Sequence, residues 1–342
     1  MMKSRFQIGN IVYELTDACN QCCRFCYNYW RDGSSAIAAP SDALARKTLR
    51  KLLSQAAVGT ISFSGGEPML LKNIHDLAMY ARLRGSNVNI LTNGTLLTPD
   101  ALANFESLGV GAIQIPLLSA DSGIHDYLTS LPGSWEKART ALWRAATLMP
   151  QGAYAVLVIT KLNAPGISET VKLIRDLRVR NVMVNRFNVG GNGIRNSDEL
   201  ALDPAALSQA FADVESFAAD HPDMRFVSGV CTPVCVVETS AYPHILFTGC
   251  SADLNRRPVT VSWRGDVRFC NHSPHVLGNI YDRPVGEILS DPEVTARYAV
   301  VPEKCTSCAH LKFCNGGCRA ASEQLYGTFA HPDPILTSGT GD

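Results

Sequence analysis

The sequence predicts an α/β fold of six strand–helix units, followed by a smaller cysteine-rich α+β segment. Short apolar runs alternate with longer segments of helical period from residue 8 to about residue 187. Short connections between such units favour parallel strands joined by right-handed crossovers. Six units are too few to close an eight-unit barrel. The pattern therefore leaves a partial barrel and an open sheet as alternatives.

Runs rich in Val, Ile and Leu are predicted as the strands. They cover residues 8–15, 59–64, 88–92, 111–118, 153–160 and 181–187. Ser41, Thr98 and Asp203 are good helix N-caps, and Pro follows two of them at the first helical position. Helices are expected over 42–57, 73–84, from 99 onward, and over 134–149, 166–178 and 204–220.

The character of the chain changes after His221-Pro222. Residues 225–330 hold eight of the twelve cysteines, many prolines and short strand-like pieces such as 258–263. Pro, Gly, Ser and Thr dominate the last residues, as in frayed ends. Three units are therefore predicted: a core domain over 8–222, a cysteine-rich domain over 223–330 and a flexible tail over 331–342.

Composition excludes several classes of protein. With 46% hydrophobic and 18% charged residues, the 342-residue chain can bury a sizeable core. Its formal net charge is zero, without the basic excess of a nucleic-acid-binding protein. No signal peptide or apolar run of membrane-spanning length is present, so a cytoplasmic protein without nucleic-acid or membrane partners is predicted. Because the cytoplasm keeps thiols reduced, the twelve cysteines are predicted to be metal ligands rather than disulfides.

The loop after the first predicted strand carries the first chemical motif. Cys19, Cys23 and Cys26 stand at C-x3-C-x2-C spacing, and Tyr27 follows at once. Thiolates suit iron–sulfur clusters, and three of them leave one iron of a [4Fe–4S] cluster open to a substrate or cosubstrate. Cys22 permits a second count, C-x2-C-x3-C, and a structural zinc site is the alternative to a cluster.

A second motif, FSGGEPML (63–70), follows the second predicted strand. Gly65 and Gly66 would let the backbone approach a ligand closely, and Glu67 places a carboxylate at the strand end. Taken alone, the segment also fits an ordinary βα turn. The cysteine and GGEP motifs together resemble the radical S-adenosylmethionine (SAM) superfamily, over residues 8–190.

This resemblance implies a partial (β/α)6 TIM-like barrel that binds a [4Fe–4S] cluster and SAM. The cluster, held by Cys19, Cys23 and Cys26 as the catalytic residues, would cleave SAM reductively. The resulting 5′-deoxyadenosyl radical would abstract hydrogen from a substrate. The residues expected to contact SAM are Tyr27, Ser64, Gly65, Gly66, Glu67, Pro68, Asn93 and Ser119.

Polar residues also end the later predicted strands, where parallel barrels build their sites. These weaker candidates are Lys161, Asn163, Asn185, Arg186 and Asn188. Each of them alone also fits a turn residue, or a polar residue whose hydrogen bonds are made within the protein. His125-Asp126, after the fourth strand, is interpreted as structural.

The second half carries another cysteine pattern, which starts with Cys250 and Cys270 and ends in a C-x2-C-x5-C-x3-C run from Cys305 to Cys318. The pattern resembles the SPASM extension of radical SAM enzymes, and implies two auxiliary [4Fe–4S] clusters. Carried over, Cys250, Cys270 and Cys318 would bind the nearer cluster, and Cys305, Cys308 and Cys314 the farther one. A pair of zinc ribbons is the alternative.

The SPASM pattern ends in a seventh cysteine downstream. This chain departs from the pattern, because no cysteine follows Cys318. Cys231 and Cys235 are additional ligand candidates, and one of them could complete each auxiliary cluster. Histidine is a minority ligand of such clusters, which makes three residues weaker candidates: His272, His275 and His310.

The resemblance indicates an enzyme that modifies a peptide, by a cross-link or an oxidation, since relatives with this extension mature ribosomal peptides. The alternative is a dehydrogenase or epimerase of a small molecule such as a sugar or cofactor precursor. An iron–sulfur electron carrier and a zinc-binding interaction protein are alternatives of another class. A reductase such as flavodoxin or ferredoxin is an expected partner. Because seven residues precede the first predicted strand, a separate peptide-recognition protein is another.

Overall fold

One curved sheet runs through the molecule in the computed structural model, which describes residues 5–33, 37–38, 41–250 and 258–336. Its strand order is β11-β10-β9-β1-β2-β3-β4-β5-β6-β7-β8. The first eight strands are β1 (Phe6–Thr16), β2 (Ala56–Gly65), β3 (Asn87–Leu91), β4 (Ala112–Pro116), β5 (Ala153–Ile159), β6 (Asn181–Arg186), β7 (Arg225–Ser228) and β8 (Ile245–Phe247).

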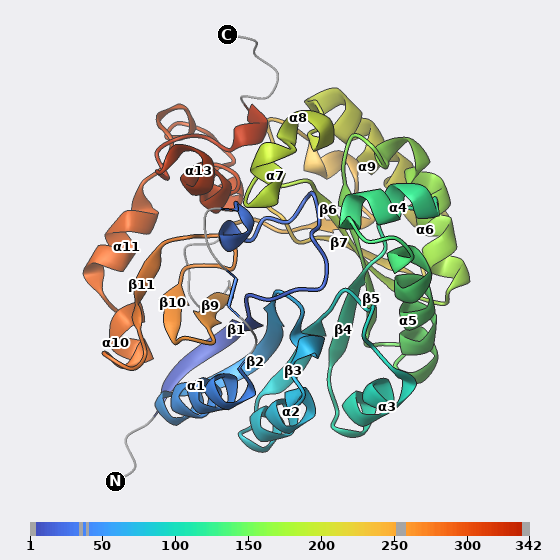
Figure 1. Ribbon diagram of the computed structural model, residues 1–342. Coiled ribbons are helices and arrows are strands. Elements are labelled where there is room, and N and C mark those ends of the chain that lie inside the picture. Colours follow the sequence, from blue (N-terminus) through green and yellow to red (C-terminus); the bar gives the residue numbers. More distant parts are fainter. Residues whose placement is uncertain (1–4, 34–36, 39–40, 251–257, 337–342) are drawn as a thin grey trace.

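Strands β1 to β8 are parallel, and each pairs with the next in the chain. The six predicted strands correspond to β1–β6, and the short strands β7 and β8 extend them. Within the described residues β8 and β11 lie at opposite edges of the sheet, so the barrel is open (Figure 1). The predicted partial TIM-like barrel is confirmed.

Helices cover the outer face of the barrel (Figure 1). They are α1 (Asp42–Gln55), α2 (Ile74–Leu83), α3 (Pro99–Ser107), α5 (Ser134–Leu148), α6 (Ile167–Asp176) and α9 (Pro204–Asp220). The three predicted N-caps are confirmed, because the side chains of Ser41, Thr98 and Asp203 each accept a hydrogen bond from a backbone N–H in the first turn. No helix in the described part of the chain is long and apolar enough to cross a membrane.

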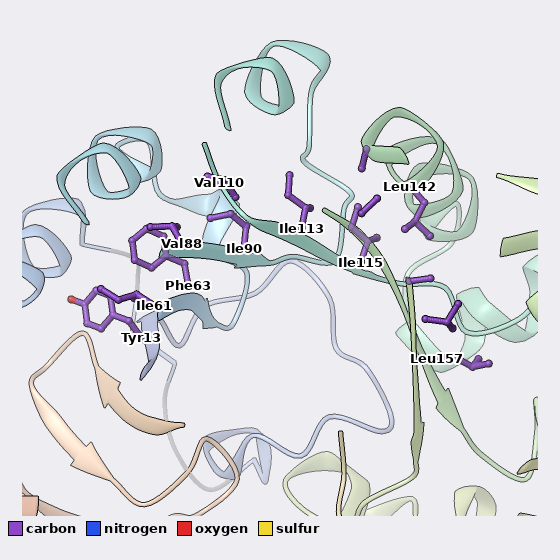
Figure 2. Packing of buried hydrophobic residues seen from close by; sticks show 14 of the residues in the cluster. Tyr13, Ile61, Phe63, Val88, Ile90, Val110, Ile113, Ile115, Leu142 and Leu157 are labelled. Carbon is purple, nitrogen blue, oxygen red and sulfur yellow. The ribbon is translucent and has the colours of Figure 1, made fainter. Parts of the chain in front are cut away.

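The core lies between the strands and these helices. Figure 2 shows Ile61, Phe63 and Val88 on the outer face of the sheet, and all three are fully buried. Burying such a side chain contributes about 1.5–3 kcal/mol relative to leaving it exposed. The Tyr13 hydroxyl donates to the Ala45 carbonyl at 2.7 Å, which ties β1 to α1 within the apolar layer.

The C-terminal region adds three strands to the same sheet: β9 (Val259–Ser262), β10 (Asp266–Arg268) and β11 (Val276–Asn279). Strand β9 pairs in parallel with β1, and β10 and β11 follow as an antiparallel ribbon. The two predicted domains thus share one hydrogen-bonded sheet. The remaining α-helices are α4 (Ser122–Thr129), α7 (Asn192–Arg195), α8 (Ser197–Leu200), α10 (Val285–Leu289), α11 (Pro292–Ala299), α12 (Leu311–Cys314) and α13 (Arg319–Tyr326).

The described part of the predicted flexible tail is packed into the fold. Asp333 is fully buried and forms an ion pair with Arg186, and its carboxylate also accepts the Cys318 N–H at 2.6 Å. Ile335 is buried as well. These contacts with distant residues hold 331–336 in the structure, whereas a flexible tail was predicted for 331–342. Residues 337–342 lie outside the described residues.

Candidate functional site

The cysteine loop leaves the carboxyl end of β1 and crosses the mouth of the barrel (Figure 1). Cys19, Cys23 and Cys26 are partly buried in it, Cys22 is exposed, and none of the four forms a disulfide. Burial raises the pKa of the Cys23 thiol well above its usual value, and the nearby Cys26 and Cys19 raise it further. Burial also raises the pKa of Cys26 to about 11. The structure thus brings the three predicted ligands together, as protonated thiols that metal binding would deprotonate.

The GGEP segment is joined directly to this loop. The Gly66 N–H donates to the Thr16 carbonyl at 2.7 Å, and the Glu67 N–H donates to the Ala18 carbonyl at 2.8 Å. A Cβ atom on Gly66 would lie 2.0 Å from the Ala18 oxygen, and Gly65 has a φ of 114°. Gly65 and Gly66 were predicted to let the backbone approach a ligand. In the structure the approach that requires them is to the cysteine loop itself.

Glu67 is buried rather than presented at the surface of the site. Its carboxylate accepts hydrogen bonds from the Thr92 hydroxyl at 2.6 Å, the Asn93 N–H at 2.7 Å and the Met69 N–H at 2.9 Å. Burial raises its pKa to about 7, although the three hydrogen bonds oppose the shift. Glu67 therefore locks the loops after β2 and β3 together.

Asn93, a predicted SAM contact, lies beside the cysteine loop. Its side-chain amide donates to Asn20 Oδ1 at 2.8 Å and lies 3.9 Å from the Cys19 sulfur. Ser119 is buried, and its hydroxyl accepts the Asp121 N–H within its own loop at 3.1 Å. Ser64 is partly buried on β2, and Pro68 is buried just after Glu67.

Tyr27 faces the C-terminal cysteine region. Its ring centroid lies 4.9 Å from that of His272, and its hydroxyl accepts a hydrogen bond from the Asn271 amide. Burial raises the pKa of its phenol above the usual range. Tyr27 therefore stays neutral, and it joins the loop that carries Cys26 to the segment that follows Cys270.

Sequence reasoning missed two groups that hold the cysteine loop. A Cβ atom on Gly191 would lie 2.3 Å from the Asn28 carbonyl oxygen, and the Asn192 amide donates to the Cys23 carbonyl at 3.2 Å. The glycine pair at 190–191, in the segment that follows β6, was an available signal. Gln324 donates to the Tyr27 carbonyl at 2.9 Å, and nothing in the local sequence points to it.

Asn163 and His125, which follow β5 and β4, form hydrogen bonds within the fold. The Asn163 amide donates to the Leu118 carbonyl at 2.7 Å, and His125 Nδ1 accepts the Leu118 N–H at 3.2 Å. Burial lowers the pKa of His125 to about 4, so the ring is neutral. The structural interpretation of His125-Asp126 is confirmed, since Asp126 accepts backbone hydrogen bonds at the start of α5.

A second group of cysteines lies where β6 meets the C-terminal region. The Asn188 amide donates to the Cys318 sulfur at 3.1 Å, and it lies 2.7 Å from His272 Nδ1. Burial raises the pKa of Cys318 to about 12, and Asp333 and Cys270 add to the shift. Cys270 and Cys318 are thus neighbours, on the side of the cysteine loop that carries Tyr27.

The third group is formed by Cys305, Cys308 and Cys314. The Cys308 N–H donates to the Cys305 carbonyl at 3.1 Å, and Cys314 ends the short helix α12. Burial and the nearby Cys314 and Cys308 raise the pKa of Cys305. A hydrogen bond from the Cys231 thiol lowers the pKa of Cys314 to about 6, despite burial.

These three groups fit iron–sulfur clusters better than single ions. In the described ranges no three Cys, His, Asp or Glu side chains converge on a point where one metal ion would bind. A cluster spreads its thiolate ligands over several irons, so thiols that are neighbours without converging suit it. Partial burial and nearby N–H donors would also favour thiolates bound to iron.

Comparison with known families matches both cysteine-bearing regions. Residues 13–174 match the radical SAM superfamily, and residues 250–310 match SPASM, an iron–sulfur cluster-binding domain. The chain belongs to the radical SAM superfamily. It is a radical SAM enzyme with a SPASM domain, and its cofactors are iron–sulfur clusters and SAM.

Individual relatives span almost the whole of this radical SAM enzyme. PqqA peptide cyclase from Xanthomonas campestris pv. campestris is 28% identical over 338 residues, 95% of this chain and 86% of the relative. AdoMet-dependent heme synthase from Methanosarcina barkeri is 25% identical over 346 residues, 95% of each chain. SuiB from Streptococcus suis, in complex with SAM, has the same fold: the TM-score is 0.73 at 17% identity, over 97% of this chain and 77% of SuiB.

Proposed function

We propose that this enzyme cleaves SAM reductively at a [4Fe–4S] cluster bound by Cys19, Cys23 and Cys26, and abstracts hydrogen from a peptide. The observation that carries the site is the joining of the cysteine loop to the loops after β2 and β3 by Gly66 and Glu67. The similarity to a peptide cyclase over 95% of the chain supports the substrate class.

The chain's own residues shape the site. When bound, the cluster and SAM supply one-electron cleavage of the SAM C5′–S bond and hydrogen abstraction. Glu67 fixes the Asn93 backbone, so the Asn93 amide stays directed at the cysteine loop. Asn192 and Gln324 hold that loop in place through their hydrogen bonds to the Cys23 and Tyr27 carbonyls. A reductase such as flavodoxin or ferredoxin would donate the electron in the cytoplasm, and a separate protein would present the peptide.

A small-molecule substrate is the second candidate. It is favoured by the match to AdoMet-dependent heme synthase, which covers 95% of both chains. Both candidates share the same SAM-cleaving site and differ only in the molecule that loses hydrogen.

The cluster assignment is tested by replacing Cys19, Cys23 and Cys26 with Ala. After anaerobic reconstitution and reduction with dithionite, we expect no 5′-deoxyadenosine, because no cluster is left to reduce SAM, while the iron of the auxiliary sites remains. Cys22→Ala is the matched control, since this exposed neighbour is not a proposed ligand, and it should keep wild-type turnover. Unchanged 5′-deoxyadenosine formation in the triple variant would refute the assignment.

The substrate class is tested by adding candidate substrates to the reduced enzyme. A short peptide encoded beside the gene should raise 5′-deoxyadenosine formation above the basal rate and lose mass by whole hydrogens. Stimulation by a tetrapyrrole or sugar precursor, with no response to the peptide, would instead favour the second candidate.

A further inference from the structure

A cavity of about 630 Å³ lies at the end of the barrel opposite the cysteine loop. Part of its wall comes just before three strands: Gln151 shortly precedes β5, Arg180 directly precedes β6, and Met224 directly precedes β7. These strands run parallel to β1, and the cysteine loop leaves the carboxyl end of β1. Parallel barrels build their catalytic sites at the carboxyl ends. The cavity is therefore separate from the SAM-cleaving site.

Three arginines line this cavity: Arg175, Arg178 and Arg180. All three are exposed. Within the described ranges none of them forms an ion pair with an acidic side chain. Asp223 is the acidic residue among those that line the cavity. The wall thus has an excess of positive charge, which attracts an anion from solution.

The backbone at Arg178 is unusual for an arginine. Helix α6 ends just before it, and Arg175 in the last turn suits the negative end of the helix dipole. Arg178 has a φ of 64°, and its N–H donates to the Arg175 carbonyl at 2.8 Å. Glycine is the usual residue at such a left-handed helix end, because a Cβ atom is disfavoured there. The end of the helix explains Arg175, but it does not explain why Arg178 carries a long charged side chain.

The remainder of the wall is suited to a small organic molecule. Ala146, Val179 and Met224 are buried apolar residues that line the cavity. Its volume lies within the range of about 300–1,000 Å³ that is typical of small-molecule pockets. Guanidinium groups bind phosphate through paired hydrogen bonds, and the Asp223 carboxylate can accept a hydrogen bond from a hydroxyl or amino group. The wall therefore combines groups for a phosphate, an apolar ring and a hydrogen-bond donor.

We propose that this cavity binds a nucleoside diphosphate. The arginines at 175, 178 and 180 bind the phosphates, the base packs against Val179 and Met224, and Asp223 accepts a hydrogen bond from the ribose or the base. Each part of the ligand thus has a matching part of the wall. The site is independent of the SAM-cleaving cluster and of the peptide or small molecule that loses hydrogen.

The first test is isothermal titration calorimetry of the full-length, anaerobically reconstituted protein. Saturating SAM is present, so that the SAM site is occupied. We expect ADP to bind, inorganic pyrophosphate to bind at least about tenfold more weakly because it lacks the base and ribose, and adenosine not to bind. The affinity for ADP should fall as salt screens the arginines. The proposal is overturned if ADP does not bind, or if pyrophosphate binds as tightly as ADP.

The second test is the Arg178→Gly variant, which removes the guanidinium and suits the left-handed backbone. We expect its thermal unfolding midpoint to equal or exceed that of the wild type, and its affinity for ADP to fall by about tenfold or more. Lys172→Ala is the matched control, because Lys172 is an exposed cation of α6 outside the cavity wall, and it should keep wild-type affinity. Arg180→Ala should also weaken ADP binding, which covers the case that Arg178→Gly folds poorly. Unchanged ADP affinity in both arginine variants, or an equal loss in Lys172→Ala, would contradict the proposal.

Discussion

At the scale of single residues, Glu67 shows how one side chain organises several loops. The motif FSGGEPML suggested a carboxylate presented to a ligand, but the structure buries it on three donors from two loops. Its raised pKa follows from that burial. The folded state binds the Glu67 proton more tightly than the unfolded state, so Glu67 makes stability depend on pH.

The Glu67→Gln variant should lose this dependence. The folded pKa of about 7 lies above the usual 4.5. The stability that Glu67 contributes is therefore full below pH 4.5 and is lost as the pH rises to about 7. Gln keeps an acceptor for Thr92 but does not ionise. Denaturant unfolding of both proteins should show the free energy of unfolding of the variant, relative to wild type, rising from about pH 5 to about pH 8. A constant difference over this range would contradict the prediction.

The residues that could be predicted from sequence are those with a local signature. Cys19, Cys23, Cys26 and Gly66 stand in short, fixed spacings, and the structure joins them. Asn192 and Gln324 hold the same loop, but their partners lie 169 and 297 positions away. A contact between residues so far apart in the sequence produces no local motif, so it could not be predicted.

At the scale of elements, β1 and β10 are linked through the barrel interior by an ion pair. Glu14 and Arg268 are both buried and pair with each other. Arg268 also donates to the Ser273 carbonyl at 2.7 Å and lies 4.8 Å from the centroid of the Tyr29 ring. The pair therefore joins the barrel, the C-terminal ribbon and the end of the cysteine loop.

Replacing Arg268 by Met should destabilise the protein by about 3–5 kcal/mol, because it leaves the Glu14 charge buried without a partner. The double variant Glu14→Gln/Arg268→Met should recover much of this loss. Arg264→Met is the control, since Arg264 is half-exposed in its pair with Asp17, and it should cost about 0–1 kcal/mol. Denaturant unfolding measures all of them, and equal effects of the two single variants would contradict the prediction.

The longer elements could be predicted from sequence and the shortest could not. Strands β1–β6 and their helices have apolar runs or helical periods long enough to read, with N-caps at Ser41, Thr98 and Asp203. Strands β8 and β10 have three residues each, too few for an alternation to appear. Helix α4 has only eight residues, with Gly123 in its first turn, and it was missed as well.

At the scale of the whole molecule, helix α1 is bonded to the C-terminal region. The Thr48 hydroxyl donates to the Trp263 carbonyl at 2.7 Å. The Gln55 side chain donates to the Ile280 carbonyl and accepts the Val285 N–H, both at 2.9 Å. Strand β9 covers the free edge of β1. The barrel and the C-terminal region are thus joined through α1 and the edge of β1.

A chain cut after residue 222 should therefore fold poorly. It would leave β1 as an exposed edge, and α1 would lose its polar partners. We expect low soluble yield and no cooperative thermal unfolding by circular dichroism. A chain cut after residue 336 is the control and should unfold like the full chain, because it keeps Asp333 and Ile335. Cooperative unfolding of the 1–222 fragment would instead establish the predicted boundary as a true domain limit.

Gln324 has a consequence for biosynthesis. Its amide donates to the Tyr27 and His272 carbonyls and its oxygen accepts the Gly191 N–H, so three distant loops meet on one side chain of α13. During translation these loops emerge long before Gln324 does. The cysteine loop can form its hydrogen bond with Gln324 only once α13 has left the ribosome, so this contact is completed late in synthesis.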